Sequence, residues 1–88
     1  MKNTSLITKS RAYVIFFMTG WKSIEVFGPP KEIMGAYLVT LKNQAVMEYN
    51  YSNYGGKHNW WKIGIGNESN DNPVIFWKEL PKPPYVIK

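Results

Sequence analysis

The sequence predicts a small, mostly-β domain, a three- to four-stranded antiparallel meander or curled sheet with an aromatic core. The chain has 88 residues, enough for one domain. Its regular segments are short, bounded by Gly, Pro or Asn, and rich in β-branched and aromatic residues. Without cysteine and with one histidine, the core must rely on four Trp, six Tyr and four Phe. Trp77 is expected in this core, with Leu38 or Val39 among its neighbours.

The N-terminal segment differs from the rest of the chain in its apolar and basic character. Residues 1–17 are predicted to be an arm or an extension, in one alternative the product of an upstream start codon, and residues 18–88 a single β domain. The apolar stretch from Ala12 to Met18 is interpreted as an extra strand or as part of the arm. It is shorter than the roughly 20 residues that cross a bilayer, so no membrane contact is expected. An arm outside the sheet exposes apolar side chains, which makes a homo-oligomer formed through this stretch an alternative.

Alternating side chains and turn residues locate the strands along the chain. The predicted strands cover residues 21–27, 35–41, 45–51, 60–65 and 73–80. Residues 35–41 have two apolar faces, as expected of a central strand, and the polar residues 42–44 form a hairpin turn after them. Residues 52–59 and 66–72 are predicted to be loops. The prolines from Pro81 to Pro84 end the pairing and form a C-terminal tail.

Two adjacent tryptophans predict which face of the strand over residues 60–65 is buried. Trp60 and Trp61 must point to opposite faces, because side chains alternate along a strand. Trp61 shares its face with Ile63 and Ile65, whereas Trp60 shares its face with Lys62. We therefore expect Trp61 in the core and Trp60 on the surface.

The sequence contains no constellation typical of a catalytic, cofactor or metal site. His58 is the only histidine and falls in a polar loop, where we interpret it as a surface residue. The acidic residues form no paired motif for acid–base catalysis. Gly55-Gly56 lacks the phosphate-loop pattern, and Gly64-Ile65-Gly66 lacks the third glycine of a dinucleotide fingerprint. We therefore expect no catalytic residue, no cofactor and no metal, in a protein that is not an enzyme.

Aromatic and lysine side chains interleave in one region, a pattern that favours a binding surface. The candidate binding patch consists of Trp60, Lys62, Lys57, Tyr49, Tyr51 and Tyr54. Trp and Tyr dominate the hot spots of protein interfaces, so one interpretation is a protein partner. Small β-sheets also stack single-stranded nucleic acid on such rings, so the other is a nucleic-acid partner. The net charge of +5 favours nucleic acid only weakly, because the lysines are scattered.

The C-terminal segment carries a family resemblance. Residues 74–84 have the sequence Val-Ile-Phe-Trp-Lys-Glu-Leu-Pro-Lys-Pro-Pro. This resembles the signature Val-Thr-His-Trp-x-x-Leu-Pro-x-Pro-Pro of the domain of unknown function 551, a family of small phage and prophage proteins that includes Eaa-like proteins. The resemblance covers about residues 21–84 and is specific only at Trp77 and the residues that follow it. Looser matches upstream are Trp21-Lys22-Ser23-Ile24, the strand that begins at Gly35, Tyr49 and Trp60-Trp61.

The resemblance implies a phage or prophage accessory protein, and the family has no established activity that could be carried over. Phe76 stands where the family often has histidine, so no polar or metal role is expected at this position. We therefore expect a non-catalytic binding protein that engages a host or phage protein. The absence of cysteine is compatible with the host cytoplasm. A single-stranded nucleic-acid-binding module is the alternative, and a small enzyme is the least favoured one. The tail from Pro81 to Pro84 is either a polyproline ligand or packs on its own domain.

Overall fold

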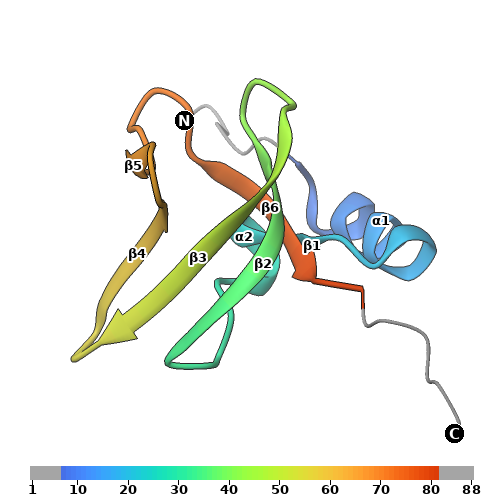
Figure 1. Ribbon diagram of the computed structural model, residues 1–88. Helices are drawn as coiled ribbons and strands as arrows, with labels where there is room; N and C mark the ends of the chain where they lie inside the picture. The colour runs from blue at the N-terminus through green and yellow to red at the C-terminus, as the bar shows by residue number, and fades with distance from the viewer. Residues whose placement is uncertain (1–6, 82–88) are drawn as a thin grey trace, which may run out of the picture.

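The computed structural model describes residues 7–81, which form one six-stranded antiparallel sheet and two helices (Figure 1). The elements in chain order are α1 (Lys9–Thr19), β1 (Lys22–Ser23), α2 (Ile24–Phe27), β2 (Met34–Leu41), β3 (Val46–Tyr54), β4 (Lys57–Lys62), β5 (Gly66–Asn67) and β6 (Val74–Glu79). The strand order in the sheet is β1-β6-β2-β3-β4-β5. The mostly-β class is confirmed. The predicted number of three to four strands is too low, because β1 and β5 have two residues each and leave no alternation to recognise.

The central hairpin of β2 and β3 matches the prediction for residues 35–51. Its turn closes between Leu41 and Ala45, whose backbone groups are joined by a hydrogen bond of 2.9 Å. Gln44 has a φ of 75°, and the Asn43 side chain accepts a hydrogen bond from the Ala45 amide. These polar residues therefore let the chain reverse at the position that the sequence predicts.

The second hairpin, β3–β4, corrects the prediction of a loop over residues 52–59. Both strands continue through this region, and Tyr54 pairs with Lys57. Only Gly55 and Gly56 lie between them, with φ values of 61° and 84°. Two consecutive positive-φ residues match the right-handed twist of flanking strands, so a two-glycine turn suffices.

The N-terminal apolar stretch from Ala12 to Met18 is helical, so its interpretation as an extra strand is wrong. Thr8 caps α1, since its hydroxyl accepts a hydrogen bond of 3.2 Å from the Arg11 amide. Gly20 ends the helix with a φ of 81°, and its amide donates to the Phe16 carbonyl at 2.8 Å. These two caps satisfy backbone groups that a helix otherwise leaves unpaired. The predicted division after residue 17 falls inside this helix.

The predicted strand over residues 21–27 is also wrong beyond its first part. Lys22 and Ser23 pair with β6, and the chain then turns into the single helical turn α2. The Ser23 hydroxyl accepts a hydrogen bond from the Val26 amide at 3.3 Å, which caps this turn. Ile24 is half-buried and packs against the core.

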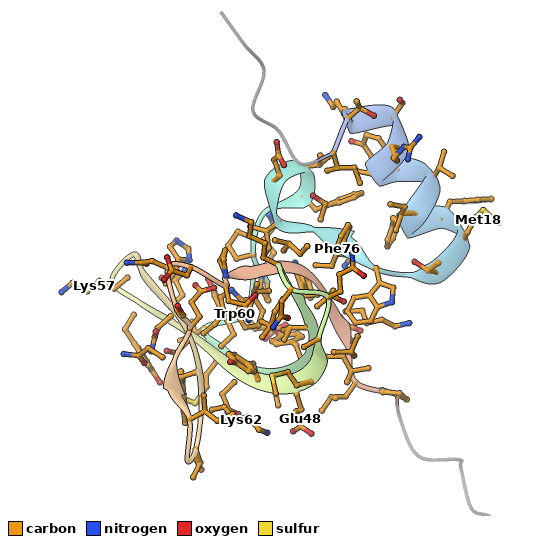
Figure 2. All side chains as sticks on the ribbon, turned by 90° about the horizontal axis from the view of Figure 1, so that it is seen from above. Met18, Glu48, Lys57, Trp60, Lys62 and Phe76 are labelled. Carbon is orange, nitrogen blue, oxygen red and sulfur yellow. The ribbon has the colours of Figure 1, made fainter. Side chains whose placement is uncertain are left out.

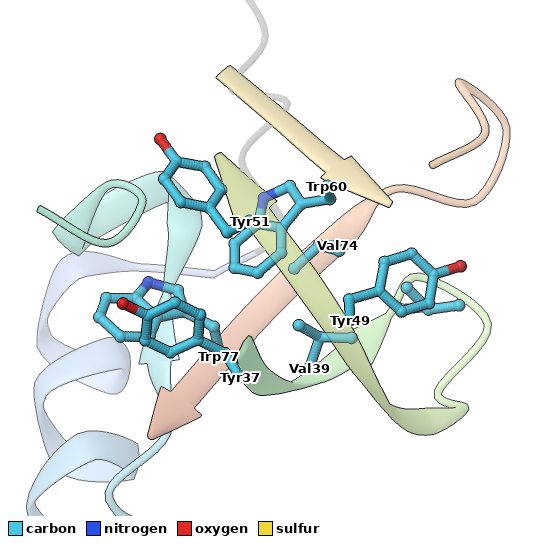
Figure 3. Close-up of a cluster of buried hydrophobic side chains, with 8 residues drawn as sticks. Tyr37, Val39, Tyr49, Tyr51, Trp60, Val74 and Trp77 are labelled. Atoms are coloured by element: carbon cyan, nitrogen blue, oxygen red, sulfur yellow. The ribbon is translucent and has the colours of Figure 1, made fainter. Parts of the chain in front are cut away.

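The core is an aromatic cluster enclosed by the curled sheet (Figure 3). Its buried members are Tyr37, Val39, Leu41, Tyr49, Tyr51, Trp60, Val74 and Trp77. Trp77 is 6% exposed and pairs across the sheet with Val39, which confirms the prediction for this tryptophan. Its indole Nε1 donates a hydrogen bond of 2.8 Å to the Gly28 carbonyl, and its ring meets Tyr37 edge-on at 5.2 Å. The segment after α2 therefore closes one side of the core.

Candidate functional site

Half of the predicted binding patch lies in the core. Trp60 is 5% exposed, Tyr49 4% and Tyr51 0%. The prediction that Trp60 points outward is therefore wrong. The register explains why: Tyr51 pairs with Trp60, and cross-strand partners share a face of the sheet. Figure 3 shows the Trp60 ring beside Tyr51, and their ring centroids are 4.7 Å apart.

The other predicted patch residues stay accessible, but they do not form one surface. Tyr54 is exposed and pairs with exposed Lys57 at the tip of the β3–β4 hairpin. Lys62 lies at the other end of β4, where its Nζ donates to the Glu48 carbonyl at 3.1 Å. Five residue steps of a strand separate the two lysines by about 16 Å. Together they provide no continuous platform for a ligand.

The residues predicted to share the core with Trp61 lie outside it. Trp61 is half-buried on the opposite face of the sheet from Trp60. Ile63 is 83% exposed and Ile65 57% exposed. The reason is that β4 ends at Lys62 and the chain reverses, with the Ile65 amide bonded to the Lys62 carbonyl. The alternation that the prediction extended through both isoleucines therefore stops before them.

One buried phenol forms a hydrogen bond with the histidine. The Tyr51 hydroxyl and the exposed His58 Nδ1 form a hydrogen bond across β3 and β4. Burial raises the pKa of Tyr51 above its usual range. The pKa of Tyr37 is also raised, first by burial and then by the Glu32 and Glu79 carboxylates. Both phenols are therefore protonated at neutral pH. The hydrogen bond between Tyr51 and His58 joins the two strands of the β3–β4 hairpin.

A groove of about 540 Å³ lies between α1, α2 and β6. We call it the β6 groove. Its wall is apolar, built mainly from Ile24, Val74, Ile75 and Phe76. Figure 2 shows Phe76 between the sheet and the two helices. The volume falls within the range of about 300–1,000 Å³ that is typical of ligand sites.

The β6 groove borders a part of β6 that β1 leaves uncovered. β1 pairs with β6 only at Phe76 and Trp77, because the chain leaves the sheet as α2. Before Phe76, and within the described residues, β6 therefore has a strand neighbour on the β2 side alone. This stretch consists of Val74 and Ile75, and the Val74 amide donates a hydrogen bond of 2.8 Å to the Glu68 carboxylate. The exposed cations Arg11 and Lys42 line the groove, together with one acid, Glu25. These residues are far apart in the sequence, so no local signal could have predicted this site.

The second accessible feature is an apolar surface on α1, which we call the α1 face. It consists of Tyr13, Val14, Phe17 and Met18, which are 49%, 56%, 90% and 77% exposed. Ala12 is the one fully buried residue of the helix. The sequence predicts this apolar segment and its capacity for association, but not its helical form.

Comparisons with known proteins identify no relative of this chain. No protein-family model, no curated protein and no solved structure matches the chain. The resemblance to the domain of unknown function 551 therefore stays a prediction. Within residues 7–81, no three side chains of His, Cys, Asp or Glu gather as a metal site. In the same part of the chain, no helix is long and apolar enough to cross a membrane.

Proposed function

We propose that this protein is a non-catalytic binding domain that engages a partner protein through the β6 groove. The observation that carries the proposal is an apolar groove of about 540 Å³ beside a partly uncovered sheet edge. Extended peptides bind at such edges by adding a strand, with main-chain hydrogen bonds for affinity and side-chain pockets for specificity. The occupant is therefore an extended segment of the partner.

Charge indicates the composition of this segment. Arg11 and Lys42 stand over an apolar wall, and the groove is lined by two cations and one acid. An apolar segment with flanking acidic residues complements such a surface, because opposite charges steer association and fix the register. We therefore expect apolar side chains against Ile24 and Ile75, with acidic residues at the rim.

The family resemblance supports a phage or prophage setting for this binding. On that basis the partner is a host or phage protein, and the place of action is the cytoplasm of the host cell. Single-stranded nucleic acid is less well supported, since base stacking needs accessible rings. Tyr49, Tyr51 and Trp60 are enclosed in the core.

Selection from an unbiased peptide library on the immobilised protein tests the proposal. The expected result is a family of peptides with apolar residues flanked by Asp or Glu. Binding should weaken at least tenfold in Ile75→Glu, which places a charge in the groove, and in Lys42→Glu, which alters only its exposed rim. The matched control is Ile63→Glu, on an exposed turn away from the groove, and it should leave binding unchanged.

Two results would contradict the proposal. One is peptide binding that Ile63→Glu abolishes and both groove variants leave intact. The other is the recovery of no peptide while the protein binds an oligothymidine in a salt-sensitive manner, which would favour the nucleic-acid alternative.

A further inference from the structure

We propose that the Glu68 carboxylate regulates the β6 groove as an intramolecular placeholder, which a bound segment must displace from the Val74 amide. The inference rests on the proposed function and deepens it. Glu68 Oε2 accepts a hydrogen bond of 2.8 Å from the Val74 amide, and Val74 lines the groove. An added strand binds through main-chain groups of this kind. The contact therefore occupies a donor that the partner segment needs.

The Val74 amide points to the edge of β6 that β1 leaves uncovered. The Pro73 carbonyl accepts a hydrogen bond of 2.9 Å from the Lys42 amide, which directly follows β2. A carbonyl and the amide after it belong to one planar trans peptide group and point in opposite directions. The Val74 amide therefore points away from β2. Main-chain groups alternate in direction along a strand, so the Ile75 amide points toward β2. Val74 thus provides the outward donor of the stretch before Phe76.

The backbone of Glu68 is held at the other end of the sheet order. Glu68 directly follows β5, and its amide donates a hydrogen bond of 2.8 Å to the Trp60 carbonyl of β4. A short turn then leads to β6 (Figure 1), and the Asn72 amide closes it on the Ser69 carbonyl at 3.1 Å. The carboxylate therefore reaches from the β5 edge to the β6 edge. It stands where a neighbouring strand would place a carbonyl oxygen.

A side-chain acceptor can leave this position without damage to the sheet. Glu68 is half-buried, and the next three residues are exposed. Rotation of the Glu68 side chain frees the Val74 amide and breaks no main-chain hydrogen bond. Val74 is 5% exposed, and an amide at such a buried residue is costly without an acceptor. The carboxylate supplies the acceptor in the free protein, and a carbonyl of the partner segment supplies it in the complex.

This competition lowers the affinity of the groove. Strand addition is open only to the fraction of molecules in which the Val74 amide is released, and the apparent affinity falls with that fraction. A hydrogen bond to a charged acceptor is stronger than one to a neutral acceptor. Removal of the Glu68 carboxylate should therefore tighten the binding of an extended segment.

The affinity of selected peptides tests the proposal. The peptide selection is run in parallel on the parent chain and on Glu68→Ala, and the dissociation constants are measured for both. Glu68→Ala should bind the peptides roughly 3- to 10-fold more tightly, because the Val74 amide is then unoccupied.

Two further variants separate the hydrogen bond from the charge. Glu48→Ala removes an exposed carboxylate from β3, which is not a neighbour of β6 in the sheet, and it should tighten binding clearly less. Glu68→Gln removes the charge and retains an acceptor oxygen, so its affinity should lie between those of the parent chain and Glu68→Ala.

Nuclear magnetic resonance of the parent chain tests the displacement without any variant. The amide resonance of Val74 and the carboxyl carbon resonance of Glu68 should both shift as peptide is added, because the hydrogen bond between them breaks. The carboxyl resonance of Glu48 is the internal control and should stay in place. This measurement decides the question even where Glu68→Ala does not fold.

Three results would overturn the proposal. The first is groove binding that leaves the Glu68 carboxyl resonance in place and is equally tight in the parent chain and in Glu68→Ala, a result that leaves the proposed function standing. The second is an equal gain in affinity for Glu48→Ala and Glu68→Ala, which would assign the effect to charge alone. The third is the recovery of no groove-binding peptide on the parent chain or on Glu68→Ala, which would overturn the proposed function as well.

Discussion

The curled sheet and the helix α1 are both rich in aromatic side chains, but the sheet buries them and the helix leaves several of them exposed. In the sheet, Tyr51, Trp60 and Trp77 are 0–6% exposed, whereas in α1 Tyr13 and Phe17 are 49% and 90% exposed. Both regions are rich in aromatic residues, so aromatic content does not decide burial. The sheet encloses one of its faces by curling, while α1 is a single helix at the edge of the molecule (Figure 1).

The contacts of the two regions differ in the same sense. In the core, four aromatic rings form a continuous chain of contacts. The ring centroids of Trp77 and Tyr37 are 5.2 Å apart, those of Tyr37 and Trp60 6.1 Å, and those of Trp60 and Tyr51 4.7 Å. In α1, the ring contacts converge on Phe27. A buried large aromatic removes about 150–250 Å² from water, so the sheet supplies most of the stability of the domain.

The largest expected effect is the loss of a core tryptophan. Trp77→Ala should lower the free energy of unfolding by about 3–5 kcal/mol, because it opens a cavity and leaves the Gly28 carbonyl without its donor. Chemical denaturation measures this loss. Trp61→Ala, on the half-buried opposite face, should cost clearly less. A larger loss of stability for Trp61→Ala than for Trp77→Ala would show that the core lies on the other face of the sheet.

A smaller effect is expected at the end of α1. Gly20 has a φ of 81°, a conformation that costs a residue with a side chain about 1–2 kcal/mol. Gly20→Ala should therefore lower the free energy of unfolding by about that amount. Thermal unfolding followed by circular dichroism measures it. Replacing Gly20 with Asn, which tolerates this conformation better, should recover part of the loss, and equal losses for Ala and Asn would argue against a capping role.

The smallest expected effect concerns the buried phenols at alkaline pH. Burial raises the pKa of Tyr37 and of Tyr51 above the usual 10.0, so the folded chain holds these protons after the unfolded chain has released them. The free energy of unfolding should therefore be unaffected by these groups below about pH 10 and fall as the pH rises further. Denaturation at about pH 8 and pH 11 should show a shallower fall in the Tyr37→Phe/Tyr51→Phe variant. Parallel falls would show that other groups carry the alkaline sensitivity.

The strands and the helices differ in how far the sequence predicts them. Alternation located β2, the first part of β3 and β6, because each has a full set of side chains on a buried face. The pairing register of β4 could also have been predicted from the sequence. The Gly55-Gly56 turn makes Tyr54 and Lys57 partners, and counting back places Trp60 opposite Tyr51. Treating this turn as a longer loop assigned the wrong tryptophan to the core.

The helix α1 shows what strand propensity misses. Its run of β-branched and aromatic residues is typical of a strand, but Thr8 and Gly20 supply the two caps of a helix. Those cap residues were the available signal. The β6 groove had no such signal, because Arg11, Lys42 and Ile75 meet only after the sheet and the helices have formed. Local rules predict elements, whereas a site between elements depends on tertiary packing.

The most direct test of the contrast between sheet and helix is the free energy of unfolding of Phe17→Ser and of Trp77→Ala, each measured by chemical denaturation beside the parent chain. Trp77→Ala should lose about 3–5 kcal/mol, because Trp77 is 6% exposed in the core. Phe17→Ser should equal the parent chain within about 0.5 kcal/mol, because Phe17 is 90% exposed. The opposite result, a Phe17→Ser variant that is clearly less stable than the parent chain, would show that Phe17 supports the core of its own domain and would contradict the contrast.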